Sequence, residues 1–139
     1  MARYDKYDPI SGGFRALLAA DFPKEDLNKV IGVGLDADGH VVKGAGQSGI
    51  RGVMILTKAR KAGDVVDVMT QGDIVDLQEG DEDLTPTAGT LYYAADADGA
   101  VSTTASTNLV GSTVESQRLV VRFQTVGAAT AEPTEPTEP

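Results

Sequence analysis

Short apolar stretches separated by glycine and aspartate fill the middle of the sequence, and they constrain its fold more than any other feature. Each stretch is three to six residues long and rich in valine, isoleucine or leucine, which suits a strand better than a helix. The stretches cover residues 30–35, 40–42, 53–57, 65–69, 74–77, 91–94, 100–103 and 118–123. Six or more short strands at near-regular spacing predict an all-β domain, built as a small barrel or sandwich. No strand–helix–strand unit is visible, which argues against an α/β enzyme fold.

The sequence Asp-Ala-Asp-Gly occurs twice, at residues 36–39 and 96–99, each time between two of the apolar stretches. Aspartate and glycine tolerate the backbone conformations that tight turns require, so each string predicts a hairpin. The glycine-rich run at 44–49 is superficially similar to a phosphate-binding loop, but no Gly-Lys-Ser/Thr follows it. We therefore expect these glycines to form bulges or to allow close approach of strands.

The same Asp-Ala-Asp-Gly strings are the best candidates for a metal site. A calcium loop of the helix–loop–helix type needs glycine at its sixth position and glutamate at its twelfth. Counted from Asp36 these positions hold Val41 and Gln47, and counted from Asp96 they hold Val101 and Thr107. The pattern therefore favours structural turns and predicts neither a metal nor another cofactor. A calcium- or carbohydrate-binding module remains the alternative.

Residues for catalysis are scarce in this sequence. There is no cysteine, and His40, the single histidine, lies beside the first predicted turn, where a solvated ring is the ordinary outcome. Clustered acids at 79–83 could serve as paired carboxylates, but a solvated acidic loop over 78–89 explains them more simply. The sequence predicts a protein that is not an enzyme and has no catalytic residues.

Residues 1–29 show neither alternation nor a sustained helical period, and they are predicted to form an extended N-terminal arm. Short helical turns are expected within the arm at 14–21 and 24–29. The arm carries four of the seven aromatic residues of the chain: Tyr4, Tyr7, Phe14 and Phe22. Aromatic residues commonly anchor interfaces, so we expect them to bind a partner surface. The alternative is that the arm folds back over its own barrel.

Charge is distributed unevenly along the 139 residues, whose net charge is −9. Residues 1–61 carry ten Lys/Arg against seven Asp/Glu, whereas residues 62–139 carry two against fourteen. An acidic half of this kind repels phosphate, so nucleic acid is not expected as a partner. The longest apolar run near the N-terminus covers only residues 16–20, which predicts neither a signal peptide nor a membrane span.

Lys58, Arg60 and Lys61 form the densest basic cluster in the sequence. Beside an acidic partner such a cluster would speed encounter and set orientation. The equally simple alternative is the solvated end of a hairpin.

The last residues repeat Glu-Pro-Thr, which favours solvated polyproline II and prevents packing into a core. The predicted organisation is therefore an extended arm at 1–29, a β domain at 30–126 and a flexible tail rich in Pro, Glu and Thr at 127–139.

Four segments carry a resemblance to a known family. They are Tyr-Asp-Lys-Tyr-Asp-Pro-Ile-Ser-Gly-Gly-Phe-Arg at 4–15, Val-Gly-Leu-Asp-Ala-Asp-Gly at 33–39, Ala-Gly-Asp-Val-Val-Asp-Val-Met-Thr at 62–70 and Gly-Thr-Leu-Tyr-Tyr-Ala at 89–94. Together they resemble capsid decoration (cement) proteins of tailed phages that infect actinobacteria, within a broader family of small phage head proteins. The resemblance spans roughly residues 4–123 and leaves out the tail.

This resemblance implies a β-barrel or β-tulip-like domain, forming a homotrimer on the outer surface of a virion capsid after assembly in the host cytoplasm. It implies that the protein binds the major capsid protein, bridges capsomers and stabilises the shell, with no catalytic residues. A tail, neck or host-adhesion β module of a virion is the alternative. The residues expected to bind the capsid are Arg3, Tyr4, Tyr7, Phe14, Arg15, Phe22, Lys58, Arg60 and Lys61.

Overall fold

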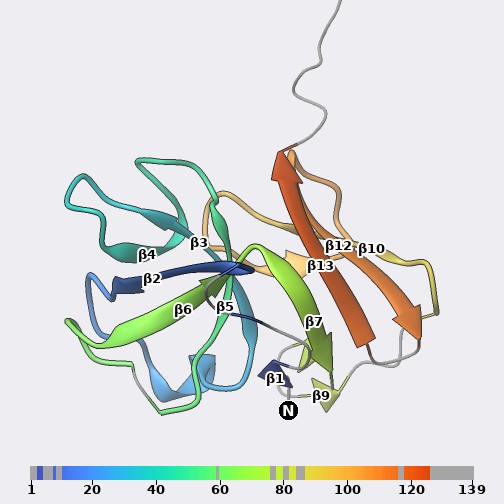
Figure 1. Ribbon diagram of the computed structural model, residues 1–139, viewed down its shortest axis with the longest axis horizontal. Helices are drawn as coiled ribbons and strands as arrows, with labels where there is room; N and C mark the ends of the chain where they lie inside the picture. Colours follow the sequence, from blue (N-terminus) through green and yellow to red (C-terminus); the bar gives the residue numbers. More distant parts are fainter. Residues whose placement is uncertain are drawn as a thin grey trace, which may run out of the picture.

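The structure is a computed structural model that describes residues 3–4, 8, 11–58, 60–75, 78–79, 82–83, 87–115 and 118–125. Strands dominate this part of the chain, and the prediction of an all-β domain is confirmed (Figure 1). The elements are β1 (Arg3–Tyr4), β2 (Gly13–Leu17), the 3-10 helix η1 (Lys24–Asp26), β3 (Val30–Leu35), β4 (Val41–Gly46), β5 (Gly52–Ile55), β6 (Val65–Met69), β7 (Gln71–Val75), β8 (Gln78–Glu79), β9 (Glu82–Asp83), β10 (Leu91–Ala94), β11 (Val101–Ser102), β12 (Asn108–Glu115) and β13 (Arg118–Thr125).

Two sheets contain most of these strands. Sheet A has the order β1-β7-β13-β12-β10-β11, and sheet B has the order β2-β6-β5-β3-β4. The pairs within them are antiparallel except for β3 and β4, which run parallel. Strands β8 and β9 form a separate two-stranded sheet. Sheets A and B lie side by side (Figure 1), and residues of both contribute to one buried cluster.

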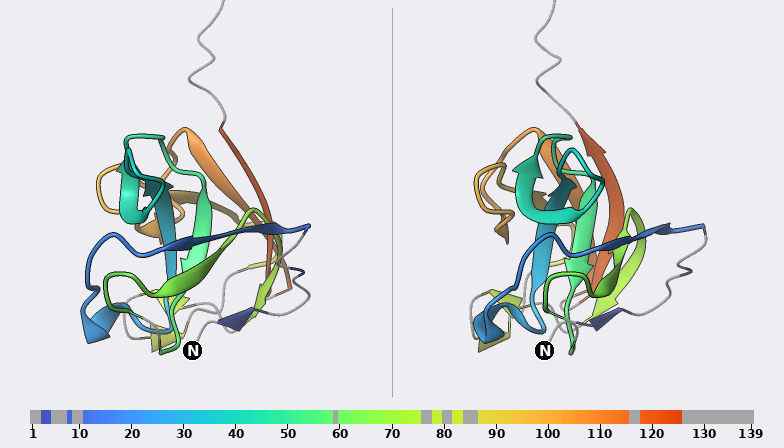
Figure 2. Two further views of the ribbon diagram at one scale, coloured as in Figure 1. Left: turned by 60° about the vertical axis from the view of Figure 1, so that its left-hand side comes forward. Right: turned by 90° about the vertical axis from the view of Figure 1, so that its left-hand side faces the viewer.

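A nearly continuous stretch of backbone joins the two sheets. Strand β6 ends at Met69 in sheet B, and β7 begins at Gln71 in sheet A, with Thr70 between them. The carbonyl of Gly12 accepts the N–H groups of Thr70 at 2.7 Å and of Gln71 at 3.1 Å. The carbonyl of Thr70 in turn accepts the N–H of Phe123 at 2.9 Å. These bonds fix the corner at which the chain changes sheets (Figure 2).

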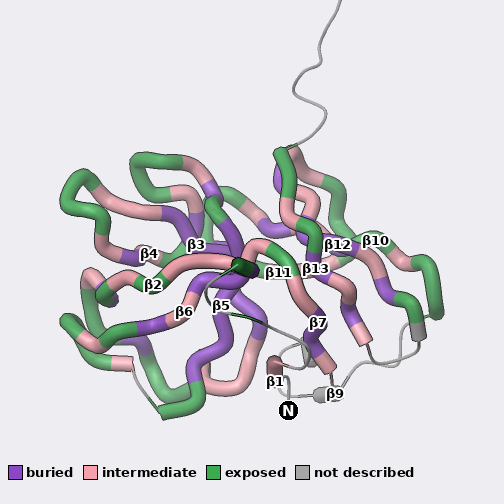
Figure 3. Tube along the Cα trace, viewed as in Figure 1, coloured by how far each residue is buried: buried purple, intermediate pink, exposed green. Residues whose placement is uncertain are grey.

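The buried residues form two clusters, one between sheets A and B and one on the other face of sheet B; buried segments accordingly run through both sheets (Figure 3). Because sheet B is buried on both faces, successive residues of a strand enter different clusters: on β5, Val53 and Ile55 belong to the first and Met54 to the second. The first cluster joins Val30, Val53, Ile55 and Met69 of sheet B to Ile74, Tyr92, Val110, Leu119 and Val121 of sheet A. The cluster of sheet B includes Leu18, Phe22, Val33, Val41, Met54, Leu56, Val66 and Val68.

The first thirty residues differ most from the sequence-based expectation. The helical turns predicted at 14–21 are wrong, because Gly13–Leu17 is a strand paired over its whole length with β6. Two isolated helical turns are marginal in water, whereas pairing with β6 places Phe14 and Ala16 against the core of sheet B. Within 24–29 only η1 is helical. The predicted separate arm is also wrong for residues 11–29, since Leu18 and Phe22 are buried.

The two Asp-Ala-Asp-Gly strings both form turns, but they lead to different pairings. After the second turn β11 runs antiparallel to β10, as predicted. The first turn is closed by the Gly39 N–H on the Asp36 carbonyl at 3.0 Å, yet β4 then pairs with β3 in parallel, so the hairpin predicted here is wrong. Positive φ angles at Gly44 (84°) and Gly46 (56°) let the chain curl back in this way. The predicted tail at 127–139 lies outside the described residues.

Candidate functional site

The aromatic residues predicted to bind a partner pack largely within the chain itself. Phe22 is only 5% exposed, and Phe14 is half-buried against the same core of sheet B. Tyr4 is half-buried, and its hydroxyl accepts the Ile55 N–H at 3.0 Å and donates to the Asp67 carbonyl at 3.1 Å. For these three residues the alternative interpretation holds, because the N-terminal segment folds back onto its own domain. Tyr7 lies outside the described residues.

Arg3 and Arg15 sit on strands that end the two sheets. Arg3, described by its backbone, pairs with Val75 on β7. Arg15 on β2 is exposed, and its Nε lies 2.8 Å from the carboxylate of Asp67. Asp67 therefore meets Tyr4 through its carbonyl and Arg15 through its side chain, which brings two of the predicted residues together.

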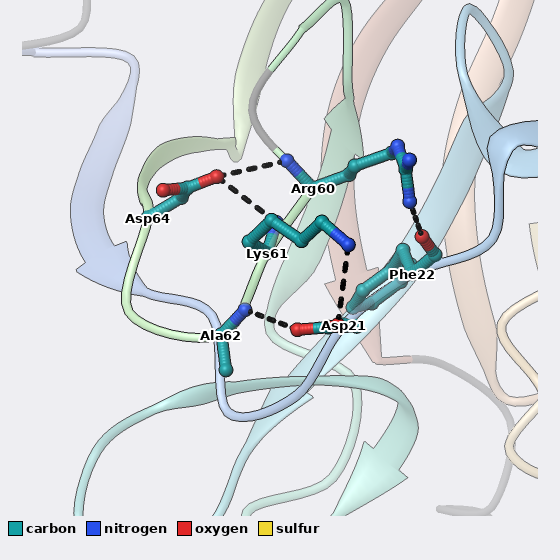
Figure 4. Close-up of polar contacts among 6 residues, drawn as sticks. All are labelled: Asp21, Phe22, Arg60, Lys61, Ala62 and Asp64. Atoms are coloured by element: carbon teal, nitrogen blue, oxygen red, sulfur yellow. Dashed lines mark hydrogen bonds and ion pairs between the residues drawn. The ribbon is translucent and has the colours of Figure 1, made fainter.

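The basic cluster is an ordered turn, which we call the basic turn (Lys58, Arg60, Lys61 and Asp64). One carboxylate oxygen of Asp64 accepts the N–H groups of Arg60 at 3.0 Å and Lys61 at 2.9 Å (Figure 4). Arg60 donates from its guanidinium to the Phe22 carbonyl at 3.0 Å, and its own carbonyl accepts the Phe22 N–H at 2.7 Å. These two bonds tie the basic turn to the segment before η1, whereas a freely solvated hairpin end would have no such bonds.

Asp21 holds the other side of the basic turn (Figure 4). Its carboxylate accepts the Ala62 N–H at 2.8 Å and lies 3.5 Å from the ammonium of Lys61. These contacts, the Ala62 N–H above all and then the Lys61 charge, lower the pKa of Asp21 below its ordinary value of 3.8. The side chain of Lys61 is still 61% exposed, and Lys58 is exposed, so both positive charges remain available at the surface.

An exposed apolar pair lies next to the basic turn. Leu17 on β2 and Val65 on β6 are directly opposite each other, and they are 38% and 59% exposed. The Gly63 N–H donates to the Leu18 carbonyl at 2.9 Å, which holds the basic turn beside this end of β2. We call Arg15, Leu17, Val65 and Asp67 the β2–β6 face. The sequence analysis missed Leu17 and Val65, because exposure of a valine within a strand leaves no signal in the sequence.

A depression of about 270 Å³ adjoins the β2–β6 face. Its lining includes Tyr4, Leu56, Thr57, Val65 and Asp67. The exposed valine is therefore part of a recessed surface, into which an apolar group of a partner could fit.

The aspartates of the two Asp-Ala-Asp-Gly turns bond to their own chain. Asp36 accepts the N–H groups of Asp38 at 2.9 Å and His40 at 3.0 Å, and these bonds, the one from His40 first, lower its pKa. In the second turn Asp98 accepts the N–H of Ala100 at 3.0 Å. Within the described ranges no three His, Cys, Asp or Glu side chains gather as a metal site would require. In that same part of the chain, no helix is long and apolar enough to cross a membrane.

The second turn also joins the two sheets. The carbonyls of Asp96 and Gly99 accept the N–H groups of Ala45 at 2.8 Å and Gly32 at 2.7 Å. A Cβ at Gly99 would lie 2.0 Å from the Gly32 carbonyl oxygen, so only glycine allows this approach. For the glycine-rich run at 44–49, the predicted close approach of strands is confirmed at Gly46, where a Cβ would lie 2.8 Å from the Leu35 carbonyl oxygen of β3.

A groove of about 470 Å³ crosses the outer face of sheet A. Arg118 and Arg122, the two basic residues of positions 62–139, both line it. Arg118 lies 2.8 Å from the carboxylate of Asp73, which is 7% exposed. One of the two positive charges is therefore compensated within the groove, and the pair serves the stability of the sheet.

Comparison with known proteins gives a match in fold. No protein-family model matches the chain, and no curated protein matches it. Among solved structures the chain is similar to one described as Mycobacterium phage Patience, with a TM-score of 0.80 and 21% sequence identity. The alignment covers 90% of this chain and 97% of that chain. At this identity the likeness shows the fold, which therefore occurs in a mycobacteriophage protein at nearly the same length.

Proposed function

We propose that this chain is a structural virion protein, not an enzyme, that binds the outer surface of a phage capsid. It works as a homotrimer on the major capsid protein, bridges capsomers and so stabilises the shell. The observation that carries the proposal is the match in fold to a mycobacteriophage chain over 90% of one molecule and 97% of the other. The sequence resemblance to capsid decoration proteins supports the same function independently.

The β2–β6 face and the basic turn together form the surface that fits the shell best. Leu17 and Val65 offer exposed apolar area, and full burial of such a side chain contributes about 1.5–3 kcal/mol. Lys58 and Lys61 place positive charge beside the pair, which orients an acidic partner. One such contact is weak, but three copies in a trimer raise the effective concentration of the others. The trimer therefore does not need a large interface in each subunit.

The alternative of a calcium- or carbohydrate-binding module is less favoured by the geometry. Asp36 and Asp98 already accept backbone N–H groups, and Asp96 accepts the side-chain amide of Asn108 at 2.8 Å. These carboxylates close their own turns, which is the ordinary structural role of Asp at such positions.

The proposal is tested by adding purified protein to phage capsids assembled without it and measuring co-sedimentation. Saturation at hundreds of copies per particle is the expected result. Saturation at a few copies would indicate a tail, neck or adhesion component instead, and no binding would overturn the proposed capsid contact. Deleting the N-terminus is a poor test, because removal of residues 1–15 would also remove β1 and much of β2.

A further inference from the structure

The strand edges of the described part of the chain leave little room for a second copy. Sheet A ends in β1 and β11, which are two residues long, and Ala100 beside β11 already bridges to Ile31 of sheet B. In sheet B the Leu18–Val41 bridge and the Ala19 N–H on the Val41 carbonyl, at 2.9 Å, join the end of β2 to β4. Closure of this kind protects strand edges. A contact between copies therefore depends on a side-chain face.

The outer face of sheet A is identified by the residues that point away from the core. On β10 Tyr92 and Ala94 are buried between the sheets, so Leu91 and Tyr93 point outward, because successive residues of a strand alternate. The register carries this face across the neighbouring strands, since directly paired residues share a face. One row consists of Leu91, Ser112, Val120 and Asp73, and the next consists of Ser102, Tyr93, Leu109 and Gln124.

Four apolar side chains on three adjacent strands form what we call the sheet A patch (Leu91, Tyr93, Leu109 and Val120). Leu91 is 47% exposed, and the other three are half-buried. The strands that carry them, β10, β12 and β13, lie together in Figure 1. An apolar patch that continues over neighbouring strands indicates a contact surface, whereas single exposed apolar residues do not.

The sheet A patch contains no charged residue, which favours a second copy as its occupant. In the two rows its members neighbour Ser102, Ser112 and Gln124, which are uncharged and can both donate and accept hydrogen bonds. The same groups of another copy can therefore satisfy them. Each copy has a net charge of −9, so two copies repel each other where their acidic surfaces meet. At this patch apolar area is buried without bringing like charges into contact.

The described charged groups that border the patch bond within their own chain. Asp73, at the end of one row, lies 2.8 Å from the guanidinium of Arg118. Asp96, which follows β10, accepts the side-chain amide of Asn108 at 2.8 Å. The guanidinium of Arg122 donates to two backbone carbonyls. The β2–β6 face differs, because a charged pair is one of its components.

We propose that copies of the chain associate through the sheet A patch in the proposed homotrimer. In a cyclic trimer each contact joins two different regions of neighbouring copies. A face four strands wide provides both regions, with the β10 side of one copy packed against the β13 side of the next. The inference rests on the proposed function, which supplies the number of copies, and it leaves the β2–β6 face free for the shell.

The absence of cysteine from the sequence allows a test with introduced thiols. Leu91→Cys places a thiol in the sheet A patch, and Val65→Cys places one on the β2–β6 face as the matched control, at residues that are 47% and 59% exposed. The rate of reaction with a small thiol reagent is measured for both variants from nanomolar to high micromolar protein concentration. Sedimentation velocity of the wild type gives its oligomeric state over the same range.

We expect the Leu91→Cys thiol to react at least tenfold more slowly once the protein has associated, and the Val65→Cys thiol to change less than twofold. If the wild type is a trimer and the two thiols respond equally, the contact lies elsewhere; the inference is overturned and the proposed capsid contact stands. A wild type that stays monomeric overturns both the inference and the proposed trimer. Protection of the Leu91→Cys thiol only on capsids would make the shell the occupant, which also overturns the inference.

A charged variant gives a second measurement of the same contact. Leu91→Glu places a carboxylate in the patch of every copy, so we expect its trimer to dissociate at a concentration more than tenfold higher than the wild type. Val65→Glu is the control and should associate as the wild type does. Unchanged association of Leu91→Glu overturns the inference. Co-sedimentation of the wild type with capsids tests the proposed function separately.

Discussion

Tyr4 on β1 donates its hydroxyl hydrogen to the backbone carbonyl of Asp67 on β6, at 3.1 Å. The same hydroxyl accepts the N–H of Ile55 on β5 at 3.0 Å, so one side chain of sheet A satisfies two backbone groups of sheet B. Because Ile55 is buried, loss of the hydroxyl leaves its N–H without this partner.

Replacement of Tyr4 by phenylalanine should therefore lower the free energy of unfolding by roughly 1–3 kcal/mol. Tyr93→Phe on β10 is the matched control, for which we expect a change below about 0.5 kcal/mol. Urea unfolding of both variants measures the difference. Equal effects of the two substitutions would show that the Tyr4 hydroxyl adds nothing to the contact between sheets.

The two Arg–Asp pairs should differ in their contribution to stability. The Arg118–Asp73 pair has side chains that are 24% and 10% exposed, whereas those of Arg15–Asp67 are 65% and 29% exposed. Asp73→Asn should lower the free energy of unfolding by roughly 2–4 kcal/mol, because the largely buried guanidinium of Arg118 loses the negative charge beside it. Asp67→Asn should cost less than about 1 kcal/mol, since water screens an exposed pair. Denaturant midpoints compare the two, and a reversed order would contradict this assignment.

Alanine substitutions at two glycines with positive φ should distinguish the cost of backbone strain from the cost of a steric clash. Gly63 (φ 88°) has open space where a Cβ would be, so Gly63→Ala should cost only about 1–2 kcal/mol of backbone strain. At Gly99 (φ 73°) the Cβ would also lie 2.0 Å from the Gly32 carbonyl oxygen. Gly99→Ala should therefore cost roughly 3 kcal/mol or more, because the second turn must move off sheet B. Thermal melts of the two proteins give the comparison.

Acid should weaken the contact between Asp21 and the basic turn. The pKa of Asp21 is lowered in the folded state, so the unfolded chain binds a proton first as the pH falls through 3.8. The stabilisation is complete above that value and is lost as the pH falls towards the lower folded pKa. Asp21→Asn keeps an oxygen for the Ala62 N–H but removes the charge, so its melting temperature should change less than that of the wild type between about pH 6 and pH 3. Parallel pH dependences would contradict this expectation.

The proposed capsid contact predicts a specific surface effect. Val65→Ser should weaken capsid binding about tenfold, because it removes exposed apolar area beside the basic turn. Val114→Ser on sheet A is the control, since Val114 is 49% exposed and lines the groove of sheet A, not the depression beside Val65. Both substitutions should leave the melting temperature nearly unchanged. A loss of binding in Val114→Ser alone would place the contact on sheet A.

The strands predicted best from the sequence are those with consecutive β-branched residues. Residues 65–69 and 118–123 lie in β6 and β13, because valine-rich runs suit a pleated, half-buried surface. Strand β12 was not predicted, since its Gly111, Ser112 and Thr113 carry little apolar signal and the neighbouring strands recruit them. Propensity also failed at β2, where helix-forming residues are held in a strand by pairing with β6.

The candidate site was predictable in part. The basic turn and Arg15 are visible in the sequence as charges, and the structure leaves Arg15, Lys58 and Lys61 exposed. The burial of Phe22 and the docking of Tyr4 could not be predicted, because both depend on contacts with strands more than thirty residues away. The exposure of Leu17 and Val65 depends in the same way on which face of β2 and β6 covers the core.

The passage of the chain from β6 to β7 through Thr70 has a mechanical consequence. A pull applied to sheet B at the β2–β6 face travels along covalent backbone into sheet A without crossing a loop. There β7 runs antiparallel to β13 over five residue pairs, from Gln71 opposite Arg122 to Val75 opposite Arg118. Tension along β7 loads the hydrogen bonds between these paired residues in shear, so that the bonds resist together and do not open one after another. The junction between the two sheets is therefore stiff along the direction of β7.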